Sequence, residues 1–134
     1  MTEKSLFARA ADMPYVVHKS HGRHSTLLVT EQDMGGKGFI LGCHTMDAGG
    51  QTAEHVHSNE QEAMFFFEGT GIASVDGQEF EIEAESVMLA PAGVKHGIRN
   101  TGTGPLKFAF VYSPPLPEHC SREEYFNHNQ DKRI

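Results

Sequence analysis

The sequence consists of short runs of β-forming residues separated by turn residues, and this rhythm restricts the possible fold more than any other feature. Gly, Asp and Asn interrupt the chain at short intervals as far as Pro114, and Asp76-Gly77 is a strong hairpin signal. No helical period of useful length lies between the runs. We therefore expect an all-β fold, an antiparallel barrel or jelly roll. The expected strands cover residues 15–18, 25–30, 38–46, 53–57, 62–68, 72–75, 79–83, 86–90, 95–100 and 106–112.

The C-terminal part of the chain has a different character, because polar residues dominate after the last prolines. Ser121 and Glu124 have the spacing of a capping box, which predicts a short helix over residues 122–128. Tyr125 and Phe126 are the large apolar side chains that this helix could bury. We expect the two aromatic residues to anchor the segment against the barrel.

The length of 134 residues suits one domain with a proper core and is too short for two domains of ordinary size. Residues 1–13 are expected to form a short N-terminal arm. Residues 25–114 should form the barrel, and residues 115–134 the C-terminal segment.

The charge of the chain argues against several classes of partner. There are 18 Asp and Glu against 11 Lys and Arg, a formal net charge of -7, which repels nucleic-acid phosphates and anionic membrane surfaces. The longest apolar run, residues 63–67, is far shorter than the roughly 20 residues needed to cross a bilayer. Residues 1–11 lack the apolar core of a signal peptide. We expect a cytoplasmic protein in which Cys43 and Cys120 are free thiols.

Three histidines and one glutamate form the pattern that carries chemistry. His55 and His57 are two residues apart on an expected strand, so both imidazoles face the same side of the sheet. Glu62 opens the next run, and His96 lies on a later strand. These four side chains predict a site for one divalent transition metal, which could be Fe, Mn, Ni, Co or Zn. Four protein ligands leave about two positions of an octahedral ion open for substrate or oxygen.

A second histidine group has an alternative interpretation. His18, His21 and His24 are spaced by three, which suits a helix face better than the strands expected around them. They could form a second metal site, although the stronger interpretation is that they lie on the surface or the rim of the barrel.

The metal-ligand pattern resembles the two sequence motifs of the cupin superfamily. This resemblance implies a double-stranded β-helix barrel, a metal site made by the four residues named above, and the homodimeric pairing usual in this family. Residues 15–18 and 25–30 would then extend the sheet of the neighbouring subunit. Glu85 stands where the second motif usually opens with glycine, which leaves the local turn in question. The matching residues are Gly49-x5-His55-x-His57-x4-Glu62-x6-Gly69 and Pro91-x-Gly93-x2-His96-x3-Asn100.

Strand alternation predicts what surrounds the metal. Side chains that share a face with the expected ligands should form a largely apolar pocket wall. Tyr112 is the best candidate for an acid or polar handle on that wall, and His44 is a second catalytic candidate. No strand-borne cation is clearly aimed at the metal, so a substrate with several negative charges would need the Lys19, Arg23 or Arg122 regions. The expected wall comprises Met64, Phe66, Ile98, Phe108 and Phe110.

These features favour a metal-dependent enzyme acting on a small carbonyl, enol or phenolic compound that chelates the metal. A dioxygenase would need a redox-active metal and a dry pocket. An isomerase, lyase or decarboxylase would need a proton carrier near the substrate instead. A non-catalytic module that binds a sugar or another small molecule is the alternative, because fold alone does not determine function.

Overall fold

The computed structural model describes residues 5–129 of the protein, and it contains every strand that the sequence predicts, with bounds shifted by a few residues. Alternating side chains and frequent turns produce short strands instead of helices, as expected. The strands are β1 (Val16–His18), β2 (Arg23–Val29), β3 (Ile40–Met46), β4 (Gln51–His55), β5 (Gln61–Glu68), β6 (Gly71–Val75), β7 (Gln78–Ile82), β8 (Ser86–Ala90), β9 (His96–Arg99) and β10 (Leu106–Ser113).

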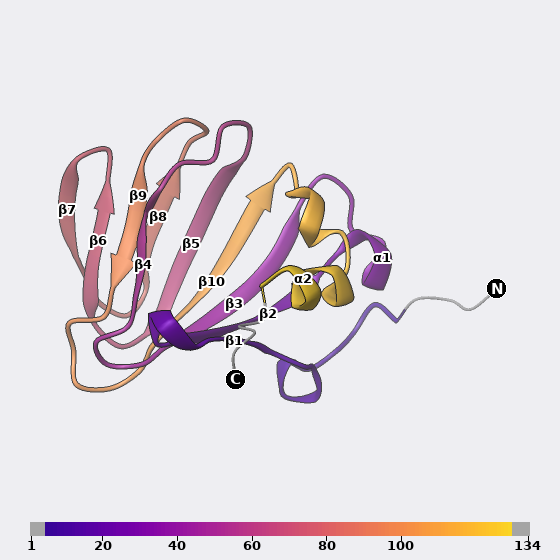
Figure 1. Ribbon diagram of the computed structural model, residues 1–134, viewed down its shortest axis with the longest axis horizontal. Coiled ribbons are helices and arrows are strands. Elements are labelled where there is room, and N and C mark those ends of the chain that lie inside the picture. The colour runs from indigo at the N-terminus through magenta and orange to yellow at the C-terminus, as the bar shows by residue number, and fades with distance from the viewer. Residues whose placement is uncertain (1–4, 130–134) are drawn as a thin grey trace.

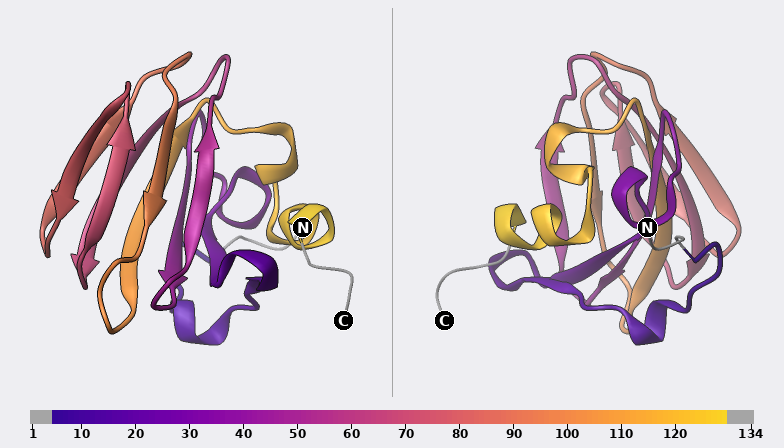
Figure 2. Two further views of the ribbon diagram at one scale, coloured as in Figure 1. Left: turned by 60° about the vertical axis from the view of Figure 1, so that its left-hand side comes forward. Right: turned by 90° about the vertical axis from the view of Figure 1, so that its right-hand side faces the viewer.

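Within residues 5–129 the strands form two antiparallel sheets that face each other as a jelly-roll barrel (Figure 1). The larger sheet has the order β1-β2-β3-β10-β5-β8, and the smaller one has the order β4-β9-β6-β7. The consecutive strands β4 and β5 therefore lie in different sheets. The short loop between them joins the end of β4 to the start of β5 across the barrel. The two turned views show the sheets as separate layers with the C-terminal elements beside them (Figure 2).

The pairing of β5 with β10 decides which side chains meet inside the barrel. On both strands every second residue is buried, as a half-covered antiparallel sheet requires. The register places Tyr112 opposite Glu62 and Phe110 opposite Met64. Apolar side chains thus fill the interior, while a carboxylate and a phenol lie side by side at one end of the same two strands.

The turn at Glu85 keeps the backbone shape for which glycine is normally used. Glu85 has a φ of 71°, in the left-handed region. Its N–H donates to the carbonyl of Phe66 over 2.6 Å, and this bond ties the turn to β5. The departure from the cupin motif therefore changes the residue and leaves the turn in place.

Short helices lie outside the strand framework. The helix α1 was not expected; it is capped at Thr30, whose hydroxyl accepts a hydrogen bond from the N–H of Asp33, and it ends at the left-handed Gly35. Within residues 5–129 no helix is long and apolar enough to cross a membrane. Both cysteines are free thiols, as predicted. The helical elements are η1 (Ala10–Asp12), η2 (Lys19–His21), α1 (Glu31–Met34), η3 (Pro117–His119) and α2 (Arg122–Asn129).

The C-terminal helix α2 begins where the capping pattern predicts. The Ser121 hydroxyl accepts a hydrogen bond from the N–H of Glu124 over 3.0 Å. Tyr125 is 5% exposed and its hydroxyl is hydrogen-bonded to that of Ser25 on β2. The expectation that Phe126 also anchors the segment is wrong, because Phe126 is 39% exposed. Adjacent helix positions point about 100° apart, so only one of the two rings can face the barrel.

We expect Tyr125→Ala to lower the free energy of unfolding by about 3 kcal/mol, since it removes a buried aromatic ring and leaves a cavity. Phe126→Ala is the matched control and should cost less than about 0.5 kcal/mol. Urea denaturation of both variants measures the difference. Equal losses from the two substitutions would show that the helix is not held by Tyr125.

Candidate metal centre

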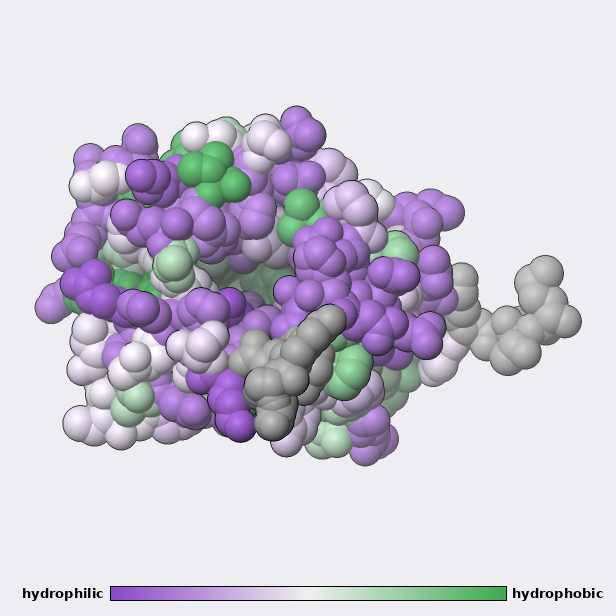
Figure 3. All heavy atoms as spheres, in the orientation of Figure 1, coloured by the Kyte–Doolittle hydropathy of each residue, from purple (hydrophilic) through white to green (hydrophobic). Residues whose placement is uncertain are grey.

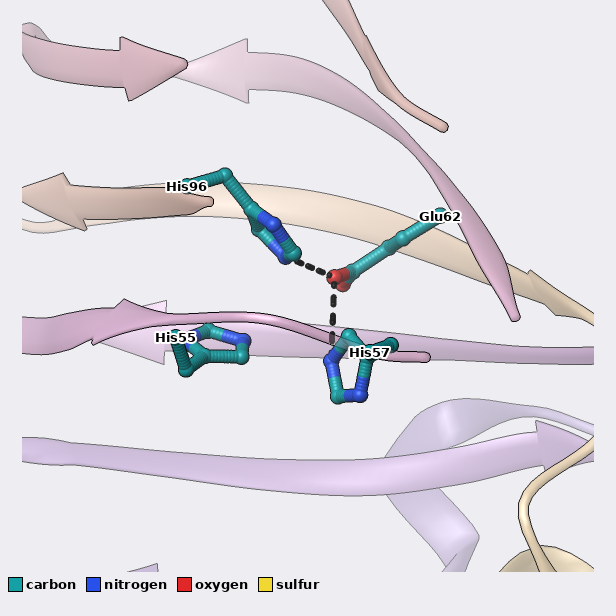
Figure 4. A group of neighbouring side chains, drawn as sticks. All are labelled: His55, His57, Glu62 and His96. Carbon is teal, nitrogen blue, oxygen red and sulfur yellow. Dashed lines mark hydrogen bonds and ion pairs between the residues drawn. The ribbon is translucent and has the colours of Figure 1, made fainter. Parts of the chain in front are cut away.

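The four predicted metal ligands come from three strand ends and one loop, and the structure brings them together (Figure 4). His55 is the last residue of β4 and pairs directly with His96, the first residue of β9. Glu62 is the second residue of β5. His57 lies beyond the end of β4 and not on it, because the strand expected over residues 53–57 runs two residues earlier, over 51–55. The ligand atoms of all four residues lie within 4.8 Å of one another.

Backbone hydrogen bonds orient two of the imidazoles. The Nδ1–H of His55 donates to the carbonyl of Ala53 over 2.8 Å, and the Nδ1–H of His96 donates to that of Val94 over 3.0 Å. These bonds occupy Nδ1 and leave Nε2 directed to the cluster, which is how a metal-binding histidine is usually held. The site is therefore organised by the backbone before any metal binds.

Glu62 supplies the negative charge at the centre of the cluster. It is buried, and its Oε1 lies 2.9 Å from Nε2 of His96 and 3.9 Å from Nε2 of His57 (Figure 4). Burial lowers the pKa of His96, but the hydrogen bonds to Glu62 and to the Val94 carbonyl outweigh it and raise that pKa overall. The pKa of His57 is lowered, mainly by burial and then by the neighbouring His55.

The donor set fits a divalent transition metal. Three imidazole nitrogens and one carboxylate oxygen are borderline ligands, and a buried carboxylate offsets part of the charge of the ion. The imidazoles of His55, His57 and His96 lie with ring centroids 4.4–5.4 Å apart. A cation would accept the lone pairs of the three imidazoles and balance the charge of the buried carboxylate.

Affinity for zinc should rise with pH because the metal competes with a proton on His96. The raised pKa of His96 means that the metal must displace a proton from this ring already above the usual histidine pKa of about 6.5, whereas the lowered pKa of His57 moves its competition with protons to lower pH. We expect about a tenfold loss of affinity for each pH unit below that point. Competition with a chromophoric chelator from pH 5 to pH 8 measures the dependence. A flat profile would contradict the role of His96 as a ligand.

Tyr112 lies directly beside the cluster. Its hydroxyl is 3.0 Å from Nε2 of His57, and the two rings meet edge-on with centroids 4.9 Å apart. Burial, and next to it the charge of Glu62, raise the pKa of Tyr112 well above its usual value. The phenol therefore keeps its proton at every physiological pH and can donate a hydrogen bond to an oxygen bound at this site.

A cavity of about 320 Å³ opens onto three of the ligands, His55, His57 and Glu62. The surface seen in Figure 3 is mostly hydrophilic and is hollowed near its middle. The sequence-predicted residues that line the cavity are Met64, Phe108, Phe110, Tyr112 and His44.

The two other expected wall residues lie in the core and away from this cavity. Phe66 packs against Phe108 with ring centroids 5.1 Å apart, and Ile98 is buried on β9. Both point inward, as strand alternation predicts. Phe66 lies two residues beyond Met64 on β5, and Ile98 lies two residues beyond His96 on β9. Both residues are therefore farther from the metal cluster along their strands.

His44 faces the cavity from β3. Its ring lies between Phe108 and Phe110, with centroid distances of 5.0 and 4.8 Å. Burial, followed by the charge of Arg23, lowers the pKa of His44 well below its usual value. His44 is thus a neutral imidazole in the wall and is not part of the ligand cluster.

Arg23 corrects the expectation that no strand-borne cation faces this space. The strand β2 begins at Arg23, two residues earlier than predicted, so Arg23 shares a face with Ser25 and lines the cavity. Its Nη1 lies 3.4 Å from Nδ1 of His44. Arg122, in contrast, donates to the carbonyls of Leu27 and Leu28 and holds the C-terminal segment in place. Continuing the alternation of β2 two residues before Ser25 would have predicted that Arg23 points to the cavity.

The histidine triplet does not gather into a second metal site within the described residues. His18 is buried and hydrogen-bonded to Ser25, whereas the ring of His24 stacks on Tyr15. His21 lies on η2 and lines the cavity. Because side chains alternate along paired strands, His18 and His24 point to different sides and contact different residues.

His119 lines the same cavity and was missed in the sequence. It follows the prolines of the C-terminal segment in η3, where no strand period exists to predict its direction. Only the packing of that segment across the barrel reveals its position.

The comparisons with known proteins agree with this architecture. The tetracenomycin polyketide synthase protein TcmJ of Streptomyces glaucescens is 28% identical over 87% of this chain and 80% of its own length. The polyketide synthase CurC of Streptomyces cyaneus is 26% identical over 75% of this chain and 66% of its own length. The structure of an RmlC-like cupin from Shewanella frigidimarina superposes with a TM-score of 0.73 and 17% identity, over 87% of this chain and 97% of that one.

The motif pattern, the histidine–glutamate cluster and most strands of the two-sheet barrel lie in one stretch of the sequence. The profile of the cupin domain matches residues 42–112, more than half of the chain. The fold is accordingly the all-β jelly-roll barrel with a C-terminal helix that the sequence predicts. This protein belongs to the cupin domain family.

Proposed function

We propose that this protein is a metal-dependent enzyme acting on a small carbonyl, enol or phenolic compound. The observation that carries the proposal is the convergence of His55, His57, Glu62 and His96 within 4.8 Å at a cavity that also contains the Tyr112 hydroxyl. The cluster also combines a buried carboxylate with a proton donor beside the space that a ligand would occupy. An enzyme that shifts protons or electrons on a bound oxygen compound can use both.

The four residues would hold one divalent metal, with Fe, Mn, Ni, Co and Zn all compatible with the donor set. Such an ion would supply Lewis-acid polarisation of a substrate oxygen or, in the case of iron, oxygen chemistry. Glu62 would offset the charge of the ion, and the Nδ1 bonds of His55 and His96 would keep both rings in place.

The remaining residues have roles that follow from their positions. Tyr112 would donate a hydrogen bond to the carbonyl or enol oxygen, and its raised pKa keeps the proton available. Met64, Phe108 and Phe110 would exclude water from the reacting group. His44 would orient the substrate and would not act as a cation, because its pKa is low.

The relatives TcmJ and CurC support an oxygen-rich substrate class. Both are polyketide synthase proteins by name. Polyketide chains carry repeated carbonyl groups, which can form enols and, after cyclisation, phenols. This chemistry agrees with the mixture of apolar wall and hydroxyl-binding groups in the cavity. The substrate of this chain itself stays a proposal.

The decisive experiment combines metal analysis with activity. Protein produced without added metal is analysed for bound metal and then incubated with diketones, phenols and keto acids while oxygen uptake and substrate absorbance are followed. Iron with oxygen uptake supports a dioxygenase. Substrate change without uptake supports an isomerase, lyase or decarboxylase. Binding without any change would favour the non-catalytic module and contradict the enzyme proposal.

We also propose that the chain forms a homodimer, so that light scattering should give about twice the chain mass of 14.8 kDa. Among residues 5–129 the outer strand β1 pairs with another strand on one side only, and Val87 and Leu89 of β8 are 76% and 54% exposed. Leu89→Glu should give a monomer if this surface of β8 is the interface and a dimer if β1 is. The chain mass for the unsubstituted protein would contradict the dimer. The cytoplasmic location and the absence of nucleic-acid and membrane partners stay predictions from the sequence.

A further inference from the structure

The C-terminal segment builds one wall of the cavity, on the side away from β4. This C-terminal wall consists of Leu116, Glu118, His119 and Tyr125. It is not part of the matched cupin domain, which ends at residue 112. The cavity therefore has a metal-binding side and a second side that is made by a separate part of the chain.

Of the two buried polar side chains on this wall, Tyr125 is hydrogen-bonded and His119 has one nitrogen without a partner among residues 5–129. The Tyr125 hydroxyl is bonded to that of Ser25, which is bonded in turn to Nε2 of His18. His119 is only 4% exposed, yet its Nδ1 has no hydrogen-bond partner among residues 5–129. Buried polar atoms are nearly always paired, so an unpaired nitrogen on a residue that lines a cavity points to a partner that comes from outside the chain.

His119 lies close to the metal cluster without belonging to it. Its ring stands 5.1 Å from that of Tyr112, which in turn stands 4.9 Å from that of His57. The ring of Tyr125 lies 5.3 Å away on the other side. The ring of Tyr112 therefore lies between His119 and His57, the nearest predicted ligand. A small ligand with one substituted ring is long enough to reach from the metal site to His119.

The charges around His119 favour an uncharged ligand group at this position. Burial lowers the pKa of His119 to about 4, so the imidazole is uncharged at neutral pH. Glu62 and Glu118 also line the cavity, with Arg23 as the opposing cation. A carboxylate on the ligand at this position would be repelled by Glu62 and Glu118. A hydroxyl group can donate a hydrogen bond to an imidazole or accept one from it, whichever tautomer is present.

We propose that the substrate carries, besides the oxygens that bind the metal, a distal hydroxyl group that hydrogen-bonds to His119. The inference rests on the proposed function and narrows its substrate class to compounds with two separated oxygen functions. Simple diketones and unsubstituted phenols fill the metal side alone. A hydroxyl placed across a ring from the chelating oxygens fills both sides of the cavity.

The test compares two probes that differ by one hydroxyl, 4-methylcatechol and 3,4-dihydroxybenzyl alcohol. Zinc-loaded protein is titrated with each by calorimetry under nitrogen, because zinc does not oxidise the probes. The unsubstituted protein should bind the alcohol about tenfold more tightly than the methyl compound. His119→Phe should remove this preference and keep the affinity for 4-methylcatechol. His119→Asn, which retains a hydrogen-bonding group near the position of Nδ1, should keep part of it.

The ratio of the two affinities within one variant does not depend on how much of the protein is folded. Equal affinities in the unsubstituted protein, or a preference that survives His119→Phe, would overturn the role of His119 and leave the metal function intact. If 4-methylcatechol binds zinc-loaded and metal-free protein equally, the chelating function fails and this inference fails with it.

Discussion

Glu62→Gln should lower the affinity for a divalent metal by more than about a hundredfold. Even the hydrogen-bond partners of metal ligands contribute about 10–100-fold, and Glu62 is a predicted ligand and the buried negative charge of the cluster. The amide has nearly the same shape as the carboxylate, so the loss would reflect charge and coordination more than packing. Competition with a chromophoric chelator at pH 7.5 gives the affinity.

The matched control for this experiment is His128→Ala. His128 is an exposed histidine on α2, and its nearest acidic partner is Glu118 at 3.9 Å. Its removal should leave metal affinity unchanged within about twofold. Thermal unfolding of both variants verifies that they are folded. Tight binding by the folded Glu62→Gln protein would show that the metal, if any, is held elsewhere.

Tyr112→Phe should lower kcat by about a hundredfold or more with the substrate that the activity screen identifies, while metal affinity stays within about twofold. The substitution removes one hydroxyl, and a positioned proton donor typically contributes about 10²–10⁴-fold. The ring still fills its place against His57 and Phe110. Steady-state kinetics and metal analysis of the same preparation separate the two effects.

Tyr125→Phe serves as the control for a buried phenol in the same cavity. The Tyr125 hydroxyl bonds to Ser25 and does not reach the cluster, so its loss should affect stability more than kcat. Because the pKa of Tyr112 is raised, the activity of the unsubstituted protein should also show no loss near pH 10 that depends on this residue. Equal kinetics for the two variants would assign Tyr112 to packing alone.

Local patterns in the sequence were sufficient for the strands and for three of the four predicted ligands. Alternation and turn residues act over a few positions, so they predict strands such as β5 and β10 without knowledge of their neighbours. The spacing from His55 to Glu62 spans one turn between two strands, and this is short enough for the motif to describe its own geometry. The apolar wall residues Phe108 and Phe110 follow from the same alternation.

Long-range packing decided the rest of the cavity. His119 approaches Tyr112 only because the segment after β10 turns back to pack beside β1 and β2 and is held against β2 by Tyr125 and Arg122. Arg23 faces the cavity because pairing with β3 extends β2 beyond its apolar run. The sequence by itself therefore determined the strand rhythm and the group of His55, His57 and Glu62, since both depend on neighbours in the chain. His96 was named from the second motif, and it meets the other ligands through the pairing of β4 with β9. The second wall of the cavity was decided by tertiary structure, because its residues meet through contacts that no local period encodes.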